Sequence, residues 1–120
     1  MRDWIDLVSR DGVPFDGIVY HCSNERFDEF RVSPNRGIYF ANEPDPEYGK
    51  YIYKCRVILK NAMYALSIDE FENDRNILIS QGFDGRIVDY KEESDDEMYD
   101  VIAFYPNQVE ILEVVEKNEY

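Results

Sequence analysis

The sequence predicts an α+β fold built as a single domain over residues 1–120, and three observations support this class. The chain has 120 residues, of which 44% are apolar, a length that suits one hydrophobic core. Short segments rich in β-forming residues recur along it. Helical patterns are few and grouped together instead of following each strand, which argues against a doubly wound sheet.

Seven segments are expected to be strands or extended, and all but 61–66 are rich in Val, Ile, Tyr or Phe. They are residues 18–22, 37–41, 51–59, 61–66, 86–90, 101–104 and 109–115. In the longest of these, the odd-numbered residues are apolar or aromatic, and the residues between them include Lys54 and Arg56. This alternation is typical of an antiparallel strand with one face in the core.

Two stretches have the features of helices. Residues 4–8 contain apolar side chains at i, i+3, i+4 spacing, which predicts a short N-terminal helix. Ser67 is followed three residues later by Glu70, the pattern of a capping box, and the helix that it begins is expected to end near Gly82. Turns are expected at residues 11–14, 82–85 and 106–107.

His21 is the only histidine, and it lies in the first predicted strand. Because neighbouring side chains of a strand point to opposite faces, His21 shares a face with Val19 and Ser23, whereas Cys22 faces the other way. His21 and Cys22 therefore cannot form a nucleophile pair within one strand. A structural role and a binding role both remain open for His21 at this point.

Two segments later in the sequence also matter for the function. One is the Gly-Ile-Tyr-Phe run that contains Tyr39, and the other is an Asp-Val-Ile-Ala-Phe run that begins at Asp100 and is followed by Gln108-Val109. In this order, the three segments resemble the ADP-ribosyltransferase superfamily. The nearest branch is the diphtheria-toxin and poly(ADP-ribose) polymerase type with its His–Tyr–Glu triad, in the small single-domain form found in phage and bacteria. The resemblance covers residues 18–115, and it implies a split sandwich of two small antiparallel sheets with an NAD-binding cleft and flanking helices.

The resemblance implies roles for individual residues. His21 would hold NAD through a ribose hydroxyl, and Cys22 would bind the nicotinamide amide through its backbone. Tyr39 would stack on the nicotinamide ring, and Asp100 would be the triad acid that holds the 2′-hydroxyl of the nicotinamide ribose. A carboxylate there stabilises an oxocarbenium-like transition state more than the ground state. His21, Tyr39 and Asp100 are thus the expected catalytic residues, and NAD is the expected substrate, with no metal ion.

Further contacts to NAD are expected on either side of these residues. Ser23 follows the histidine motif and is counted with the NAD-binding residues. Tyr51 is the candidate for a second stacking ring, with Tyr48 as the alternative. Arg36 is the expected partner of the pyrophosphate, and Arg31 is the other cation near the histidine and tyrosine segments in sequence.

The chain departs from the family pattern in three ways. Cys22 stands where a glycine is usual, and Asp100 stands where a glutamate is usual. No Glu-x-Glu or Gln-x-Glu pair precedes the last motif, so the arginine-modifying branch is not indicated.

Charge and composition limit the expected partners and compartment. The 26 acidic residues exceed the 13 Lys and Arg, giving a net charge of −13. Such a chain repels nucleic-acid phosphates and attracts a protein with a basic contact surface. No apolar run approaches ~20 residues and no secretion signal is recognised, which predicts a cytoplasmic protein with reduced Cys22 and Cys55 and no membrane contact. The cysteines and the single histidine lack zinc-type spacing.

The expected function is therefore that of an NAD-dependent mono-ADP-ribosyltransferase acting on a protein, as a phage-borne or toxin-type effector. Two alternatives stay open. One is a catalytically inactive fold of this type that binds a protein through its acidic surface, and the other is a toxin that only hydrolyses NAD.

Overall fold

The computed structural model describes residues 12–27, 29–32, 37–44, 49–66, 74–90 and 98–116. These residues form six strands, one short α-helix and a 3-10 turn. The strands are β1 Val13–Ser23, β2 Ile38–Ala41, β3 Tyr51–Leu66, β4 Gly85–Asp89, β5 Tyr99–Ala103 and β6 Val109–Glu116, with helix α2 at Arg75–Ser80 and the 3-10 turn η1 at Pro106–Gln108. The predicted N-terminal helix and the capping box at Ser67 lie outside the described residues.

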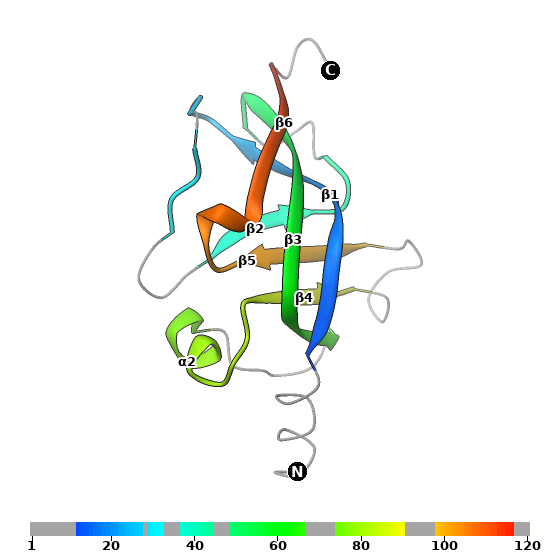
Figure 1. Ribbon diagram of the computed structural model, residues 1–120. Coiled ribbons are helices and arrows are strands. Elements are labelled where there is room, and N and C mark those ends of the chain that lie inside the picture. The colour runs from blue at the N-terminus through cyan, green and yellow to red at the C-terminus, as the bar shows by residue number, and fades with distance from the viewer. Residues whose placement is uncertain are drawn as a thin grey trace.

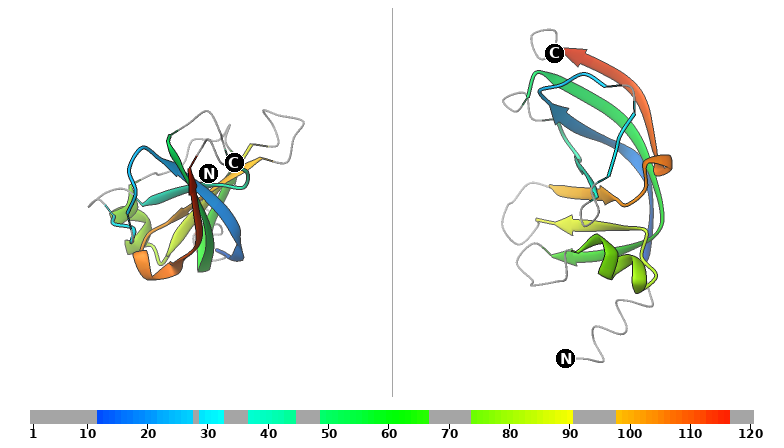
Figure 2. Two further views of the ribbon diagram at one scale, coloured as in Figure 1. Left: turned by 90° about the horizontal axis from the view of Figure 1, so that it is seen from above. Right: turned by 90° about the vertical axis from the view of Figure 1, so that its left-hand side faces the viewer.

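The strands form one continuous sheet that curves into two layers. Its order is β1-β2-β5-β4-β3-β6, and β1 also pairs with β3, so five strands close into a ring with β6 on its outside. The ring closes through β3, which pairs with β1 along most of its length and with β4 at residues 62–66. In Figure 1, β1, β3 and β6 run together across the direction of β2, β5 and β4, and Figure 2 shows the layers from the side.

This sheet differs from the expected pair of antiparallel sheets in two ways. The segments 51–59 and 61–66 form a single strand, and the last part of that strand runs parallel to β4. Asn61 does not end the strand because its polar groups are satisfied. Its backbone N–H and that of Lys60 donate to the Asp84 carboxylate at 2.9 and 2.8 Å, and its side-chain amide donates to the carbonyl of Gly82 at 2.9 Å.

Two element boundaries also differ from the predictions. The turn expected at 11–14 is wrong at its second half, because Val13 and Pro14 belong to β1. The pairing with β3 shifts register between Val13 and Phe15, and such an irregularity accommodates a proline near a strand end. The helix expected to begin at Ser67 begins later, because α2 has its N-cap at Asp74. Its end agrees with the prediction, since the chain leaves the helix through Gly82, whose φ of 97° favours glycine.

The main core lies between the two layers. The predicted alternation along β3 is confirmed from Tyr53 to Leu59, where Tyr53, Cys55 and Val57 are fully buried and Lys54 and Arg56 are exposed. Ile52 departs from it, because its side chain belongs to the other face and is 2% exposed. A second, smaller apolar cluster lies beneath α2 and contains Leu78, Phe83, Met63, Ile102 and Phe104.

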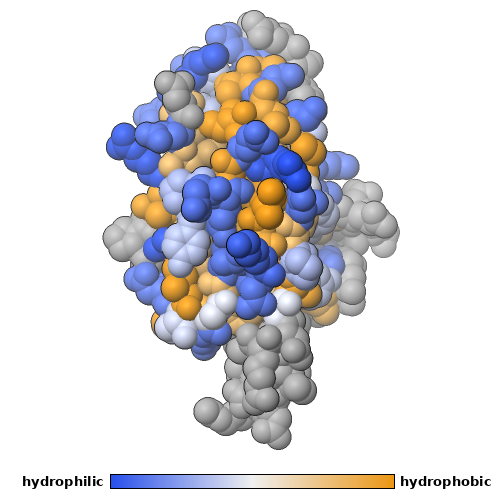
Figure 3. Space-filling model, viewed as in Figure 1, coloured by the Kyte–Doolittle hydropathy of each residue, from blue (hydrophilic) through white to orange (hydrophobic). Residues whose placement is uncertain are grey.

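The outer face of the β1–β3–β6 layer is mixed in character. Figure 3 shows apolar patches among hydrophilic ones on this side of the molecule, and the exposed large hydrophobic side chains of the three strands include Ile18, Ile58 and Leu112. The one α-helix in the described part of the chain has six residues, too few to cross a bilayer.

Candidate functional site

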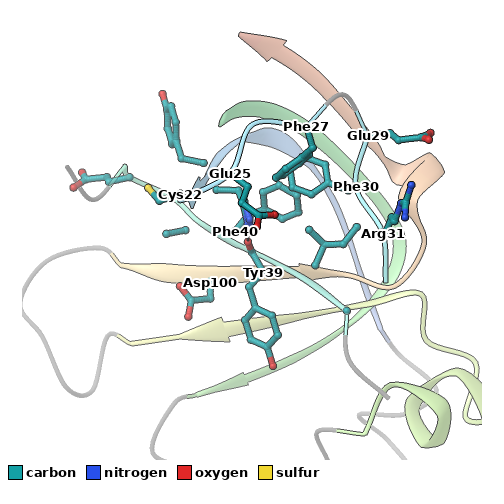
Figure 4. A pocket seen from close by; sticks show the side chains of 15 residues that line it. Cys22, Glu25, Phe27, Glu29, Phe30, Arg31, Tyr39, Phe40 and Asp100 are labelled. Atoms are coloured by element: carbon teal, nitrogen blue, oxygen red, sulfur yellow. Dashed lines mark hydrogen bonds between the residues drawn. The ribbon is translucent and has the colours of Figure 1, made fainter. Parts of the chain in front are cut away.

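A cavity of about 970 Å³ opens where β1 and β2 diverge. These two strands share a single residue pair, Tyr20 with Ala41, and separate beyond it. The cavity is lined by the end of β1, by Glu25, Phe27 and residues 29–31 after it, by β2 with its flanking residues Gly37 and Glu43, and by Asp100 on β5 (Figure 4). Segments distant in sequence therefore meet at one concave site.

The imidazole of His21 is packed edge-on among aromatic rings. Its centroid lies 5.0 Å from that of Phe30 and 5.8 Å from that of Phe40, and the rings of Phe27 and Tyr53 are each 6.2 Å away. Its Nδ1 lies 2.7 Å from the backbone carbonyl oxygen of Tyr39. Burial lowers the pKa of His21, and the hydrogen bond to Tyr39 offsets this only in part. His21 is therefore a neutral imidazole that donates from Nδ1 and keeps Nε2 as an acceptor.

The lowered pKa predicts a pH dependence of stability. Unfolded His21 takes up a proton near its ordinary pKa, whereas folded His21 does so only at lower pH. The unfolded state therefore binds more protons, and the free energy of unfolding should fall as pH drops from about 7 to about 5. His21→Phe keeps an aromatic ring in the cluster and should flatten this slope, as urea unfolding at several pH values will show. An equal slope in both proteins would contradict a neutral buried His21.

Tyr39 and Asp100 lie on one face of the β2–β5 pair. Ala41 pairs with Asp100 and Tyr39 pairs with Ile102, and directly paired residues share a face. Phe40 points the other way and is 2% exposed, whereas Tyr39 is 41% exposed. Phe40 therefore faces the core and Tyr39 is exposed on the other face, and both residues line the cavity. In Figure 4, Tyr39 points away from the rings of Phe27 and Phe30 and toward the side of Asp100.

The Asp100 carboxyl group is half-buried, and this burial raises its pKa. The Tyr90 hydroxyl donates to Asp100 Oδ2 at 2.7 Å and pulls the pKa back down. Two hydrogen bonds between Asn42 and Tyr99 hold the start of β5, next to Asp100. The backbone N–H of Asn42 donates to the carbonyl of Tyr99 at 3.1 Å, and the Asn42 side-chain oxygen accepts from the Tyr99 N–H at 3.1 Å.

The cavity brings together four of the residues expected at the NAD site, namely His21, Cys22, Tyr39 and Asp100. His21 approaches the backbone of β2 on the side of Phe40, while Tyr39 and Asp100 lie on the other side, so the cavity reaches both faces of this strand.

Two other expected residues do not line the cavity. The Ser23 hydroxyl oxygen accepts the N–H of Glu25 at 3.1 Å, and Tyr51 packs against the main core. Arg36 and Tyr48 lie outside the described residues.

The sequence interpretation did not assign Phe27, Phe30 or the neighbouring acids to the site. Phe27 stacks on Tyr53 with centroids 4.3 Å apart, and the Tyr53 hydroxyl accepts the N–H of Phe27 at 2.7 Å and donates to the carbonyl of Glu25 at 3.0 Å. These contacts hold the segment after β1 as one wall of the cavity. Its signal in the sequence is the pair of phenylalanines three residues apart within an otherwise polar segment.

The lining is acidic. Among the residues that the structure describes, the cavity has four carboxylates and one cation, which are Glu25, Glu29, Glu43, Asp100 and Arg31. No group of three His, Cys, Asp or Glu side chains in the described ranges is arranged to hold a metal ion.

Comparison with models of protein families, with curated proteins and with solved structures found no match. The likeness to ADP-ribosyltransferases therefore rests on the three sequence motifs alone.

Proposed function

We propose that this protein is an NAD-dependent mono-ADP-ribosyltransferase that modifies a protein target, as an effector of the phage or toxin type. One observation carries the proposal: His21, Tyr39 and Asp100, which come from three separate strands, line a single cavity. Its volume of about 970 Å³ is within the range of small-molecule sites. Two layers of strands that separate at this cavity are also compatible with the split sandwich that the resemblance implies.

Each of the three residues has a state that suits its proposed role. Tyr39 exposes a ring on which nicotinamide can stack. His21 keeps Nε2 as an acceptor for a ribose hydroxyl because Nδ1–H is already bound to Tyr39. Asp100 supplies a carboxylate at the end of a rigid strand. In the reaction, the bond between nicotinamide and ribose breaks, nicotinamide leaves with the bonding electron pair, and an acceptor side chain forms the new bond and loses its proton.

Incubation with NAD labelled in its ADP-ribose portion, together with a cell lysate, tests the proposal. A labelled protein band is expected with the wild-type protein and is expected to be lost in Asp100→Asn. Release of nicotinamide without a labelled band would indicate that the protein hydrolyses NAD and does not transfer ADP-ribose. No band and no released nicotinamide would reject both enzymes.

A second function is favoured by the charge of the cavity. Four carboxylates against one arginine form a better surface for a basic protein segment than for a pyrophosphate. On this alternative the protein has no activity on NAD and binds a basic partner through the acidic cavity, and binding weakens as salt screens the charges.

Arg31 separates the two functions because the effects of its removal have opposite signs. If the cavity binds NAD, Arg31→Ala should weaken NAD binding by roughly two- to fivefold, the scale of an exposed ion pair. If it binds a basic segment, the same change should strengthen binding of a lysine-rich peptide by a similar factor. Calorimetry with both ligands measures this. Arg26→Ala is the matched control, since Arg26 is an exposed arginine of the same segment that does not line the cavity.

A further inference from the structure

Tyr90 follows the last residue of β4 and reaches the Asp100 carboxylate from the neighbouring strand. Val88 pairs with Asp100, so Val88, Tyr90 and Asp100 share one face of the sheet. The backbone N–H of Tyr90 donates to the carbonyl of Met98 at 3.0 Å, which continues the ladder beyond the strand. With its backbone fixed in this way, Tyr90 can direct its hydroxyl to Asp100 Oδ2, 2.7 Å away.

The Asp100 carboxylate depends on this contact. Within the described residues, the Tyr90 hydroxyl is the one hydrogen-bond partner of the Asp100 side chain, and no ion pair involves it. A half-buried carboxylate with a single donor takes its orientation from that donor. The other titratable groups around the cavity are Tyr20, His21, Cys22 and Tyr39 on β1 and β2, and Glu25, Glu29, Arg31 and Glu43 on the adjoining segments.

We propose that Tyr90 is a positioning residue, which orients the Asp100 carboxylate at the cavity and favours its ionised form. The inference rests on the proposed function, because it gives Tyr90 a part in holding the triad acid ready for the ribose. Asp is one methylene shorter than the glutamate usual at this motif, so its reach is shorter and its orientation matters more. A neighbouring hydroxyl that fixes the orientation suits a site where an error of about 1 Å can cost ~100-fold in rate.

The test is a carboxyl titration by NMR, in which Asp100→Asn identifies the Asp100 signal. Tyr90→Phe keeps the ring and removes the donor that favours the charged carboxylate, so it should raise the pKa of Asp100. The matched control is Tyr64→Phe, because Tyr64 also donates to a carboxylate, that of Asp89, at a position that does not line the cavity. It should leave the Asp100 titration unchanged. An unchanged Asp100 pKa in folded Tyr90→Phe would overturn the proposal.

Transfer assays and a mutant cycle complete the test. Near pH 6, Tyr90→Phe should transfer ADP-ribose roughly tenfold more slowly, the scale of a lost hydrogen bond to a charged group, and the deficit should shrink as pH rises. In urea unfolding, the effects of Tyr90→Phe and Asp100→Ala should be non-additive, and additive effects would count against the contact. If the Asp100 pKa moves as expected while the wild-type protein transfers nothing, the proposed function fails and the coupling of Tyr90 to Asp100 stands.

Discussion

Asp100→Asn is expected to lower the rate of ADP-ribose transfer by roughly 100-fold or more, the effect of removing one electrostatic contact to a transition state. The substitution keeps the size of the side chain and an oxygen that can accept from Tyr90. It removes only the negative charge that would stabilise the cationic sugar. Initial rates with labelled NAD at saturating target measure the loss. Asp100→Glu should retain activity or raise it, since it restores the acid that is usual at this motif.

The stability of Asp100→Asn at pH 7 should not fall with its activity. The folded state raises the pKa of Asp100 because burial disfavours its charge, so the contribution of this group to stability is present at low pH and is lost as pH rises through the folded pKa. A neutral Asn therefore costs the fold nothing at pH 7 on this account. A folded and inactive Asp100→Asn would consequently mark a functional loss.

Two other carboxylates serve as controls for this assignment. Glu43 lines the same cavity, and Glu43→Gln should change the rate little because Glu43 is exposed and follows the end of β2. Glu97 belongs to the acidic run before the last motif and lies outside the described residues. If Glu97→Gln were the inactive variant and Asp100→Asn were active, the motif would be misaligned by three residues.

Side-chain alternation was predictable because it depends on local sequence. The period of two along β3 required only a strand with one face in the core, and burial follows it between Tyr53 and Lys60. The opposite directions of Tyr39 and Phe40 follow from the same rule. The stop of α2 near Gly82 was also predictable, since a helix commonly ends at a glycine with positive φ.

Long-range pairing was not predictable from the sequence. Nothing local indicates that β3 runs without interruption past Asn61 or that its end pairs parallel with β4. The continuity depends on Asp84, which is distant in sequence and accepts from two backbone N–H groups at this point. The wall of the cavity also depends on a long-range contact, because the Tyr53 hydroxyl on β3 accepts from the N–H of Phe27.

Charge in the cavity also required the structure. The sequence interpretation treated the acidic excess as a property of the surface. Three of the four carboxylates that line the cavity come instead from the segments after β1 and β2. They line one cavity because β1 and β2 diverge after a single pair.

Tyr53→Ala is expected to reduce the free energy of unfolding by about 3–5 kcal/mol, the cost of truncating a fully buried aromatic ring. Tyr53 is 0% exposed and contacts the rings of His21, Phe27 and Phe30. Because small domains have about 5–15 kcal/mol in total, this change brings the protein close to unfolding. Urea unfolding should show a lower midpoint with an unchanged dependence on urea concentration.

Tyr53→Phe separates the hydroxyl from the ring. It leaves the N–H of Phe27 and the carbonyl of Glu25 without their partner, which should cost about 1–2 kcal/mol. Tyr51→Phe is the matched control, two residues earlier on the same strand, where no hydrogen bond of the Tyr51 hydroxyl is formed with the described residues. If Tyr53→Phe also weakens ligand binding while Tyr51→Phe does not, the wall after β1 belongs to the binding site. Equal stability of the two Phe variants would mean that the Tyr53 hydroxyl does not hold this wall, and the cavity would then depend on ring packing alone.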